Sequence, residues 1–347
     1  MLGLKIGIDF GSAVLNICVA GRGTVVSEPS VMLCDAESGK PLAMGKAAVE
    51  MLGRTPSSLK TVLPVRDGVV DNLEAAQQML RPYITLLCGN RLFKPNVLIG
   101  VPTAVTRNEK RALLSILTDC GCGRVCFIEK PLAAAIGAKE DSLRSAAVLC
   151  ADIGAGSTDA ALISMGSICA SAFSRTGGRH LTAGIRRYLQ HTRGYEVGFL
   201  TAEEIKKQVG GAMQRDTEVA VLVNGKNTAT GLPETFEVTS TELYWVLRAD
   251  LEEIAKTVLE CVASVPDALL PDVMRDGILL TGGAARLFGM RQWLAERTDI
   301  PVHVAQEPER AVINGLNLVL KDVGHLFSGE YVYPDAQISA GGNETVE

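Results

Sequence analysis

The feature that most constrains this chain is a repeated turn, in which an apolar strand ends at an aspartate and a glycine-containing turn leads into a returning strand. The first copy follows residues 4–9 and the second follows residues 146–152. Their sequences are Asp9-Phe10-Gly11-Ser12 and Asp152-Ile153-Gly154-Ala155-Gly156-Ser157-Thr158. No repeat with the ~20–50-residue period of a solenoid accompanies them. The chain is therefore predicted to contain two related halves that face each other.

The length of 347 residues fits two domains, since a domain usually takes ~100–200 residues. Strands alternate with helical patterns throughout, which predicts the α/β class. The spacing of apolar residues predicts helices over residues 71–87, 107–119 and 241–263. A β-hairpin is predicted between residues 219 and 238, with its turn at Asn224-Gly225.

Charge and hydropathy exclude some classes of function. The net charge of −5 argues against a protein that binds nucleic acid through bulk electrostatics. No apolar run reaches the ~18–20 residues that a membrane-spanning helix needs. The first residues alternate as a strand and reach Asp9 without a secretory pattern. We therefore expect a cytoplasmic protein.

The two turns carry groups that suit a phosphate. Turns with little side-chain bulk let backbone N–H groups approach phosphate oxygens, and Ser12, Ser157 and Thr158 add hydroxyls. The carboxylates of Asp9 and Asp152 suit Mg²⁺, a hard cation that prefers oxygen ligands. The alternative is a pair of ordinary hairpins with a turn aspartate. Two copies after matching strands favour phosphate binding, and neither a Walker A nor a strand–G-x-G-x-x-G–helix pattern occurs.

With three further segments, these turns resemble the motifs of the actin, heat-shock-chaperone and sugar-kinase superfamily. The segments are Ile128-Glu129-Lys130-Pro131-Leu132-Ala133-Ala134-Ala135-Ile136-Gly137, Leu280-Thr281-Gly282-Gly283-Ala284 and Ala311-Val312-Ile313-Asn314-Gly315, with the second hairpin between the first two. Within it the chain is most similar to MreB-type bacterial actins, the rod shape-determining proteins. The segments that carry this likeness include Glu28-Pro29-Ser30-Val31, Arg66-Asp67-Gly68-Val69 and Leu92-Phe93-Lys94-Pro95. The resemblance covers about residues 4–325.

This resemblance implies an actin-like fold of two lobes, each a mixed sheet flanked by helices, with smaller subdomains. The first lobe would span 1–145, with a small subdomain at about 32–66. The second would span 146–325, with a small subdomain at about 179–239 and a last helix at about 309–322 that packs back toward the first lobe. Residues 326–347 would form a polar tail.

The resemblance also implies ATP or ADP as the ligand, with Mg²⁺ held by Asp9 and Asp152, partly through water. Residues from four segments would contact the nucleotide: Ser12, Ala13 and Val14; Ala155, Gly156 and Ser157; Glu203, Glu204, Ile205 and Lys206; Gly282, Gly283 and Ala284. The first two groups would line the phosphates, the third would flank the ribose and base, and the last would lie against adenine. Without the family match, the alternative for Glu203–Lys206 is the solvated start of a helix, where acids favour the N-terminus.

The chain departs from this family at the position before Pro131. MreB-like proteins normally carry there the glutamate that positions the attacking water, and this chain carries Lys130. A lysine is not a general base at pH 7, but it adds a positive charge near the γ-phosphate. Glu129 is adjacent, yet neighbouring strand residues point to opposite faces. Val14, Ala155 and Arg179 are further departures, so we expect an ATP-binding protein with slow hydrolysis.

Leu92-Phe93 lies between Arg91 and Lys94, in a loop that inserts into the inner leaflet in MreB-like proteins. Two apolar side chains flanked by cations suit an anionic lipid surface, and the alternative is the buried start of a strand. The resemblance further implies head-to-tail filaments of the chain itself at the inner membrane surface, with cell-wall morphogenesis proteins as partners and no nucleic acid.

Four alternatives remain open from the sequence. A small-molecule kinase of the superfamily would need an acceptor-binding domain, and a chaperone would need a C-terminal substrate domain. A division-type relative would need an amphipathic tail helix, which Pro334–Glu347 does not offer. A hydrolysis-deficient paralogue that modulates another filament agrees with Lys130.

Overall fold

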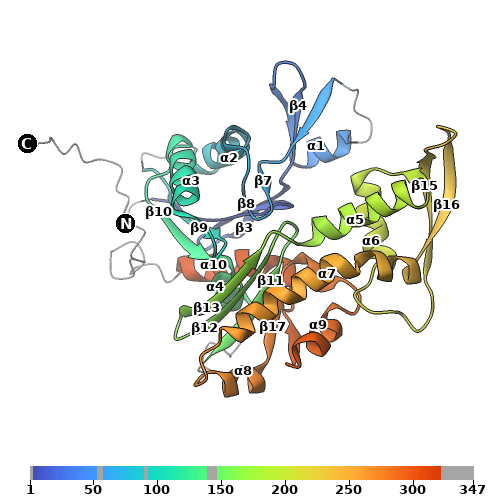
Figure 1. Ribbon diagram of the computed structural model, residues 1–347. Helices are drawn as coiled ribbons and strands as arrows, with labels where there is room; N and C mark the ends of the chain where they lie inside the picture. The colour runs from blue at the N-terminus through green and yellow to red at the C-terminus, as the bar shows by residue number, and fades with distance from the viewer. Residues whose placement is uncertain (1–2, 53–57, 90–92, 139–146, 322–347) are drawn as a thin grey trace, which may run out of the picture.

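The computed structural model describes residues 3–52, 58–89, 93–138 and 147–321 (Figure 1). Two five-stranded mixed sheets form its framework. The first is built from β1 (Lys5–Phe10), β2 (Val14–Val19), β3 (Gly23–Pro29), β9 (Asn96–Val101) and β10 (Val125–Glu129), and the second from β11 (Val148–Ile153), β12 (Thr158–Ser164), β13 (Ser167–Ser174), β17 (Ile278–Thr281) and β18 (Val302–Val304). The predicted α/β class with mixed sheets is confirmed.

The two sheets share one topology. The first has the order β10-β9-β1-β2-β3 and the second has the reversed order β13-β12-β11-β17-β18. In each sheet the central strand pairs antiparallel with the strand that follows it, as β1 does with β2 and β11 does with β12. On its other side each central strand pairs parallel, β1 with β9 and β11 with β17. The repeated turn in the sequence is therefore the visible part of a structural repeat.

Helices cover both sheets. The first-lobe helices are α2 (Leu73–Cys88), α3 (Arg107–Asp119) and α4 (Lys130–Gly137), and the second-lobe helices are α5 (Gly178–His191), α6 (Phe199–Val209), α7 (Ser240–Ala263), α8 (Leu270–Asp276), α9 (Met290–Thr298) and α10 (Ala311–Lys321). Local signals begin several of them: Asn72 caps α2, and capping boxes start α3 at Thr106 and α7 at Thr239. Figure 1 shows α7 along the second sheet, where it packs on β12 and β13.

The helix pair α4 and α10 joins the two sheets. Helix α10 lies against β1 and β2, while α4 lies against β11 and β12, and the two helices pack on each other. Gly137 and Gly315 lie at their crossing, where an added Cβ on Gly315 would overlap the carbonyl oxygen of Ala133. The close crossing therefore depends on glycine.

Two smaller sheets extend from the lobes. In the first lobe, β4 (Met32–Asp35), β5 (Pro41–Met44) and β6 (Leu59–Val62) pair beside α1 (Lys46–Met51), around a small core of Val31, Leu33 and Ala48. A short hairpin of β7 (Val65–Arg66) and β8 (Val69–Val70) follows. In the second lobe, β14 (Tyr195–Glu196), β15 (Ala220–Asn227) and β16 (Pro233–Thr239) form the other small sheet.

The predicted boundaries at 145 and 325 and the tail 326–347 lie outside the described residues. Among the described helices, none combines the length and the apolar character needed to cross a membrane.

The predicted turn at Asn224-Gly225 is wrong, although the hairpin exists. Both residues lie inside β15, where Gly225 pairs with Glu234, and the turn lies at residues 228–232. Gly225 serves packing instead, since an added Cβ would lie 2.8 Å from the ring of Phe236. The Asn227 side chain begins the actual turn by accepting from the N–H of Ala229 at 2.9 Å.

Candidate functional site

The two Asp-Gly turns close in the same way. Gly11 N donates to Val14 O at 3.0 Å, and Gly154 N donates to Ser157 O at 2.9 Å. The aspartates that precede them lie on the equivalent central strands and are both buried. We call the turn of residues 10–14 the first hairpin tip and the turn of residues 153–158 the second hairpin tip.

The two hairpin tips meet each other and the β7–β8 turn. Ser12 Oγ accepts a hydrogen bond from Gly68 N at 3.1 Å. An added Cβ on Gly156 would overlap Ser12 Oγ, and one on Gly68 would lie 2.6 Å from Ser157 Oγ. Only glycine allows this approach at both positions. Three predicted phosphate residues, Ser12, Gly156 and Ser157, are thus brought to one place from opposite lobes.

The start of α5 braces the second hairpin tip. Gly178 N donates to Gly154 O at 3.0 Å, and Arg179 N donates to Ala155 O at 2.7 Å. The guanidinium of Arg179 lies over the ring of Phe199 at 5.2 Å, and its Nε is buried without a hydrogen-bond partner among the described residues. Burial lowers the pKa of Arg179, and Glu203 opposes that shift. A cationic side chain therefore lies directly behind this tip.

The other two predicted phosphate residues of the first hairpin tip are Ala13, which makes a backbone hydrogen bond, and Val14, which reaches the surface. Ala13 O accepts from Ser30 N at 2.8 Å, which fixes the first hairpin tip to the residue just after β3. Val14 begins β2 and is partly exposed.

Lys130 lies against the first aspartate. Its Nζ is 2.9 Å from Asp9 Oδ1, and each side chain is only 13% exposed. Asp152 accepts a hydrogen bond from Thr281 Oγ1 at 3.0 Å. Burial raises the pKa of Asp152 to about 6, while the nearby charge of Lys130 lowers it. The two aspartates are thus held by different partners.

Glu129 lies on the face of β10 opposite to that of Ile128. Its neighbour Ile128 packs in the core that surrounds α4 and α10, whereas Phe127 packs against the first-lobe core. Glu129 shares the side of Phe127, because alternate strand residues share a face. Its Oε2 is buried without a hydrogen-bond partner among the described residues. The strand ends at Glu129 and Lys130 begins α4, so the predicted alternation between these two neighbours does not apply, and Lys130 rather than Glu129 reaches Asp9.

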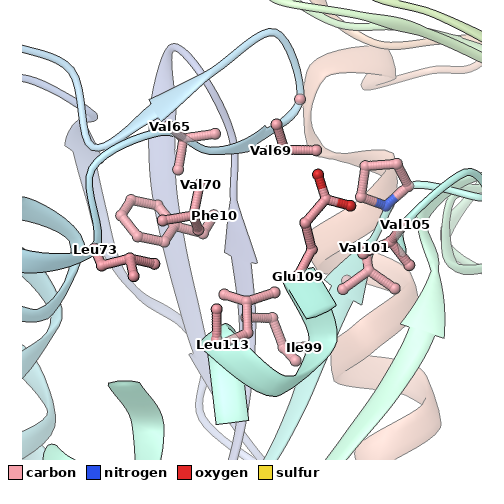
Figure 2. Close-up of a pocket in the computed structure, with 14 residues that line it drawn as sticks. Phe10, Val65, Val69, Val70, Leu73, Ile99, Val101, Val105, Glu109 and Leu113 are labelled. Atoms are coloured by element: carbon pink, nitrogen blue, oxygen red, sulfur yellow. The ribbon is translucent and has the colours of Figure 1, made fainter. Parts of the chain in front are cut away.

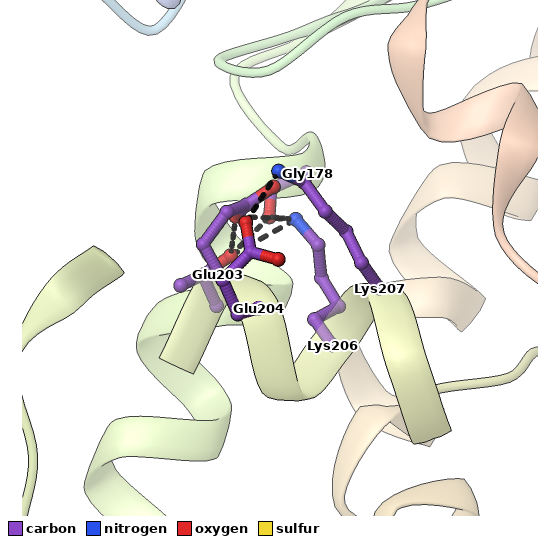
Figure 3. Close-up of polar contacts among 6 residues, drawn as sticks. Gly178, Glu203, Glu204, Lys206 and Lys207 are labelled. Carbon is purple, nitrogen blue, oxygen red and sulfur yellow. Dashed lines mark hydrogen bonds and ion pairs between the residues drawn. The ribbon is translucent and has the colours of Figure 1, made fainter. Parts of the chain in front are cut away.

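The stretch Glu203–Lys206 forms a buried polar network on α6 (Figure 3). Lys206 Nζ donates to Gly178 O at 2.7 Å, to Thr182 Oγ1 at 2.9 Å and to Glu203 Oε2 at 2.8 Å. These three contacts use all three donors of the ammonium. Burial lowers the pKa of Lys206, and Glu203 opposes the shift. The network couples α6 to the start of α5 and so to the second hairpin tip.

The other two members of that stretch play separate parts. Ile205 is buried in the second-lobe core, and Glu204 is exposed in an ion pair with Lys207 at 2.8 Å.

In the last predicted segment, Gly282 has a φ of +84°, and an added Cβ there would overlap Ile153 O. Gly283 meets open space, and Ala284 is half-buried. This glycine turn therefore lies directly beside the second hairpin tip.

A small apolar cavity adjoins the first hairpin tip (Figure 2). It has a volume of about 40 Å³ and is lined by side chains that include Phe10, Val65, Leu73, Val101 and Leu113. A water molecule takes about 30 Å³, so this cavity does not have room for a nucleotide. The candidate site is placed instead at the meeting point of the hairpin tips, because the predicted phosphate residues Ser12, Gly156 and Ser157 converge there.

The structure adds residues that the sequence did not single out. Thr103, just after β9, donates from N and Oγ1 to the carboxylate of Asp159 on β12, at 2.9 and 2.6 Å. Burial raises the pKa of Asp159 to about 7, although the bonds from Thr103 lower it. A charged residue inside the apolar strand Asp159-Ala160-Ala161-Leu162 was the available signal. Asp67 and Gly68, which meet the hairpin tips, are indicated in the sequence only by the family likeness.

These residues fit a nucleotide. Backbone N–H groups and the hydroxyls of Ser12 and Ser157 match the donors that phosphates need, and the side-chain position of Gly283 meets open space beside the second hairpin tip. They do not fit a magnesium site made by both predicted aspartates, because Lys130 already contacts Asp9. In the described residues no group of three or more potential metal-ligating side chains occurs.

Of the predicted membrane pair, Leu92 lies outside the described residues, as does Arg91. Phe93 is 52% exposed and precedes β9, which begins at Asn96. Phe93 is therefore not the buried start of a strand, which was the alternative to a membrane-binding loop.

The sequence matches the family described as MreB/Mbl protein over residues 3–327. It is 35% identical over 327 residues to the cell shape-determining protein Mbl of Bacillus subtilis (strain 168), covering 94% of this chain and 98% of that protein. It is 34% identical over 340 residues to the cell shape-determining protein MreB of Escherichia coli (strain K12), covering 95% and 98%. MreB5 of Spiroplasma citri bound to ADP aligns with a TM-score of 0.89 at 30% identity, covering 94% and 99%. The chain therefore belongs to the MreB/Mbl family of actin-like, cell shape-determining proteins.

Proposed function

We propose that this chain binds ATP and ADP between its lobes and assembles head to tail with itself into membrane-associated filaments that help to set cell shape by guiding cell-wall synthesis. The observation that carries the proposal is that the two hairpin tips meet, which brings the predicted phosphate residues of both lobes together. Their contact is so close that an added Cβ on Gly156 would overlap Ser12 Oγ. Related MreB5, solved with ADP, supports the choice of nucleotide. Cell-wall morphogenesis proteins are the proposed partners, and nucleic acid is not.

The nucleotide binds with its phosphates between the tips. Residues 12–14 and 155–157 supply backbone N–H groups and hydroxyls, and the Gly282–Ala284 turn supplies a flat surface for adenine. Because the tips touch in this structure, phosphate binding requires them to separate. Nucleotide therefore links the positions of the two lobes.

Hydrolysis is slow in this proposal. Lys130 stands where the family resemblance implies the glutamate that positions water, and its ammonium is paired with Asp9 at 2.9 Å. Burial opposes the charge of Lys130, but Asp9 and the neighbouring carboxylates raise its pKa above the ordinary value. It remains protonated at neutral pH and accepts no proton from water.

Membrane contact is proposed for the segment that contains Leu92 and Phe93. The exposed ring of Phe93 beside Lys94 offers apolar burial together with attraction to anionic lipid. One such segment binds weakly, and a filament multiplies it. The proposed location is thus peripheral, at the inner face of the cell membrane.

A second candidate is a hydrolysis-deficient relative that modulates the filament of another family member, and Lys130 is the observation that favours it. A small-molecule kinase is a further alternative. It predicts ATP consumption that rises when a small acceptor is added.

Electron microscopy of the purified full chain with ATP, with and without anionic liposomes, tests the proposal. Filaments that form with ATP support it. A chain that binds ATP but stays monomeric contradicts self-assembly and supports the modulator. Absence of ATP binding by calorimetry contradicts both.

A further inference from the structure

Four ionisable side chains gather below the hairpin tips, and one of them is a cation. Asp9, Asp152 and Asp159 supply three buried carboxylates, and Lys130 supplies the ammonium. Lys130 Nζ lies 2.9 Å from Asp9 Oδ1, and the negative charges of Asp152 and Asp159 also stabilise its ammonium. A polyphosphate bound above this cluster would add several negative charges to it.

A cation is required in such a place. Like charges in a poorly solvated site repel strongly, so carboxylates and phosphates lie together only when a positive charge separates them. A magnesium ion commonly does this, held by one or two carboxylates and the phosphates. Lys130 provides a positive charge at the same point through a covalent tether.

The lysine also obstructs the ion. It occupies Asp9 Oδ1, which the aspartate would otherwise offer to the metal or to one of its waters. Mg²⁺ needs near-octahedral geometry at about 2.0–2.1 Å, and it would lie beside an ammonium of like charge. Asp152 accepts one hydrogen bond, from Thr281 at 3.0 Å, which does not prevent it from binding an ion, so the obstruction lies at Asp9.

We propose that Lys130 takes the place of the divalent cation in this chain, so that ATP and ADP bind without Mg²⁺. This inference rests on the proposed nucleotide binding and goes beyond it, because a family member can bind nucleotide and still depend on the metal. Bound nucleotide is then insensitive to chelation.

Calorimetric titration of the full chain with a non-hydrolysable β,γ-imido ATP analogue, in excess EDTA and in excess Mg²⁺, measures this directly. We expect the two Kd values to agree within about threefold. A wild-type Kd that weakens by about tenfold or more in EDTA overturns the inference and leaves nucleotide binding intact. Absence of binding in both buffers overturns the proposed function and the inference together.

Two variants sharpen the test. Lys130→Glu replaces the tethered cation by a carboxylate, so its Kd in EDTA should weaken by at least about tenfold relative to Mg²⁺. Lys256→Met, on the exposed side of α7, removes a lysine elsewhere and should bind as wild type does in both buffers. Equal binding of Lys130→Glu with and without Mg²⁺ overturns the assigned role of Lys130.

A melting curve supplies a second measurement that does not depend on activity. Adding Mg²⁺ to the nucleotide-saturated wild type should leave its Tm unchanged, whereas the same addition should raise the Tm of nucleotide-saturated Lys130→Glu. A wild-type Tm that rises with Mg²⁺ contradicts the inference. The unliganded melts verify that each variant folds.

Discussion

Thr103 and Asp159 tie the two lobes together with two hydrogen bonds to one carboxylate. Thr103 follows the last residues of β9 in the first sheet, and Asp159 lies on β12 in the second. The hydroxyl donates to Oδ1 at 2.6 Å and the backbone N–H donates to Oδ2 at 2.9 Å. The crossing of α4 and α10 is another junction, so this pair adds a point at which the lobes are joined, close to the hairpin tips.

The Thr103 hydroxyl should matter for stability. Thr103→Val keeps the shape and the backbone donor but removes the donor to Oδ1, leaving a buried carboxylate with one partner fewer. We expect a loss of about 1–3 kcal/mol in the apparent free energy of unfolding at pH 8, measured with urea. Thr103→Ser keeps a hydroxyl and should stay near wild type. Equal stability of the valine and serine variants would show that the hydroxyl contributes nothing.

Asp159 should make stability depend on pH. Burial raises the pKa of Asp159 from 3.8 to about 7 in the folded chain, with Thr103 and Lys130 acting against the shift and Asp152 adding to it. The folded state therefore holds this proton more tightly than the unfolded state. Its contribution to stability is complete below the unfolded pKa and is lost as the pH rises toward about 7.

Asp159→Asn removes this titration. The free energy of unfolding of the variant, minus that of wild type, should increase between about pH 5 and about pH 8, with a slope of at most about 1.4 kcal/mol per pH unit. Urea unfolding across this range measures it. Asp267→Asn, at an exposed position, should leave the profile unchanged. A constant difference between Asp159→Asn and wild type would contradict the raised pKa.

Local sequence was enough to predict the helices over residues 71–87, 107–119 and 241–263 and both hairpin tips, because their signals lie within a few residues. The capping box of Thr106 with Glu109 and the glycines of both tips act at short range. The misplaced turn at Asn224-Gly225 had a local signal as well, but packing under Phe236 decided the position of that glycine.

The rest of the site depends on contacts between distant segments. Thr103 and Asp159 come from different lobes, and so do Gly68 and Ser157. The sequence identified Lys130 as a departure from the family, but the choice of Asp9 as its partner needed the three-dimensional arrangement. Likewise, the spacing of Glu203 and Lys206 did not indicate that Lys206 would direct all three donors into the protein.

The crossing of α4 and α10 should tolerate no side chain at Gly315. Gly315→Ala adds a methyl group that overlaps Ala133 O, so the helices must move apart. We expect a loss of at least about 1–3 kcal/mol in the apparent free energy of unfolding, measured with urea. Gly198→Ala, whose added Cβ meets only Thr201 at 3.8 Å, should cost at most about 1 kcal/mol, because alanine is a poorer N-cap for α6 than glycine but overlaps no atom. Wild-type stability in Gly315→Ala would refute the close crossing.

Position 130 should control the rate of hydrolysis. Lys130→Glu supplies a carboxylate in place of the ammonium, and we expect phosphate release from ATP in Mg²⁺ to rise by at least about tenfold. Lys130→Met removes the charge without adding a base, so its rate should stay as low as that of wild type. A wild-type rate of phosphate release equal to or above that of Lys130→Glu would contradict the proposal of slow hydrolysis.

The segment at Leu92 and Phe93 should determine membrane binding. The double variant Leu92→Ser/Phe93→Ser replaces two apolar side chains, and Phe93 is 52% exposed in the folded chain. Because binding scales with buried apolar area, we expect co-sedimentation with anionic liposomes to fall several-fold in the presence of ATP. Met165→Ser changes an apolar side chain that is 97% exposed in the turn between β12 and β13, and it should co-sediment as wild type does. If the double variant binds liposomes undiminished while still forming filaments, another surface contacts the membrane.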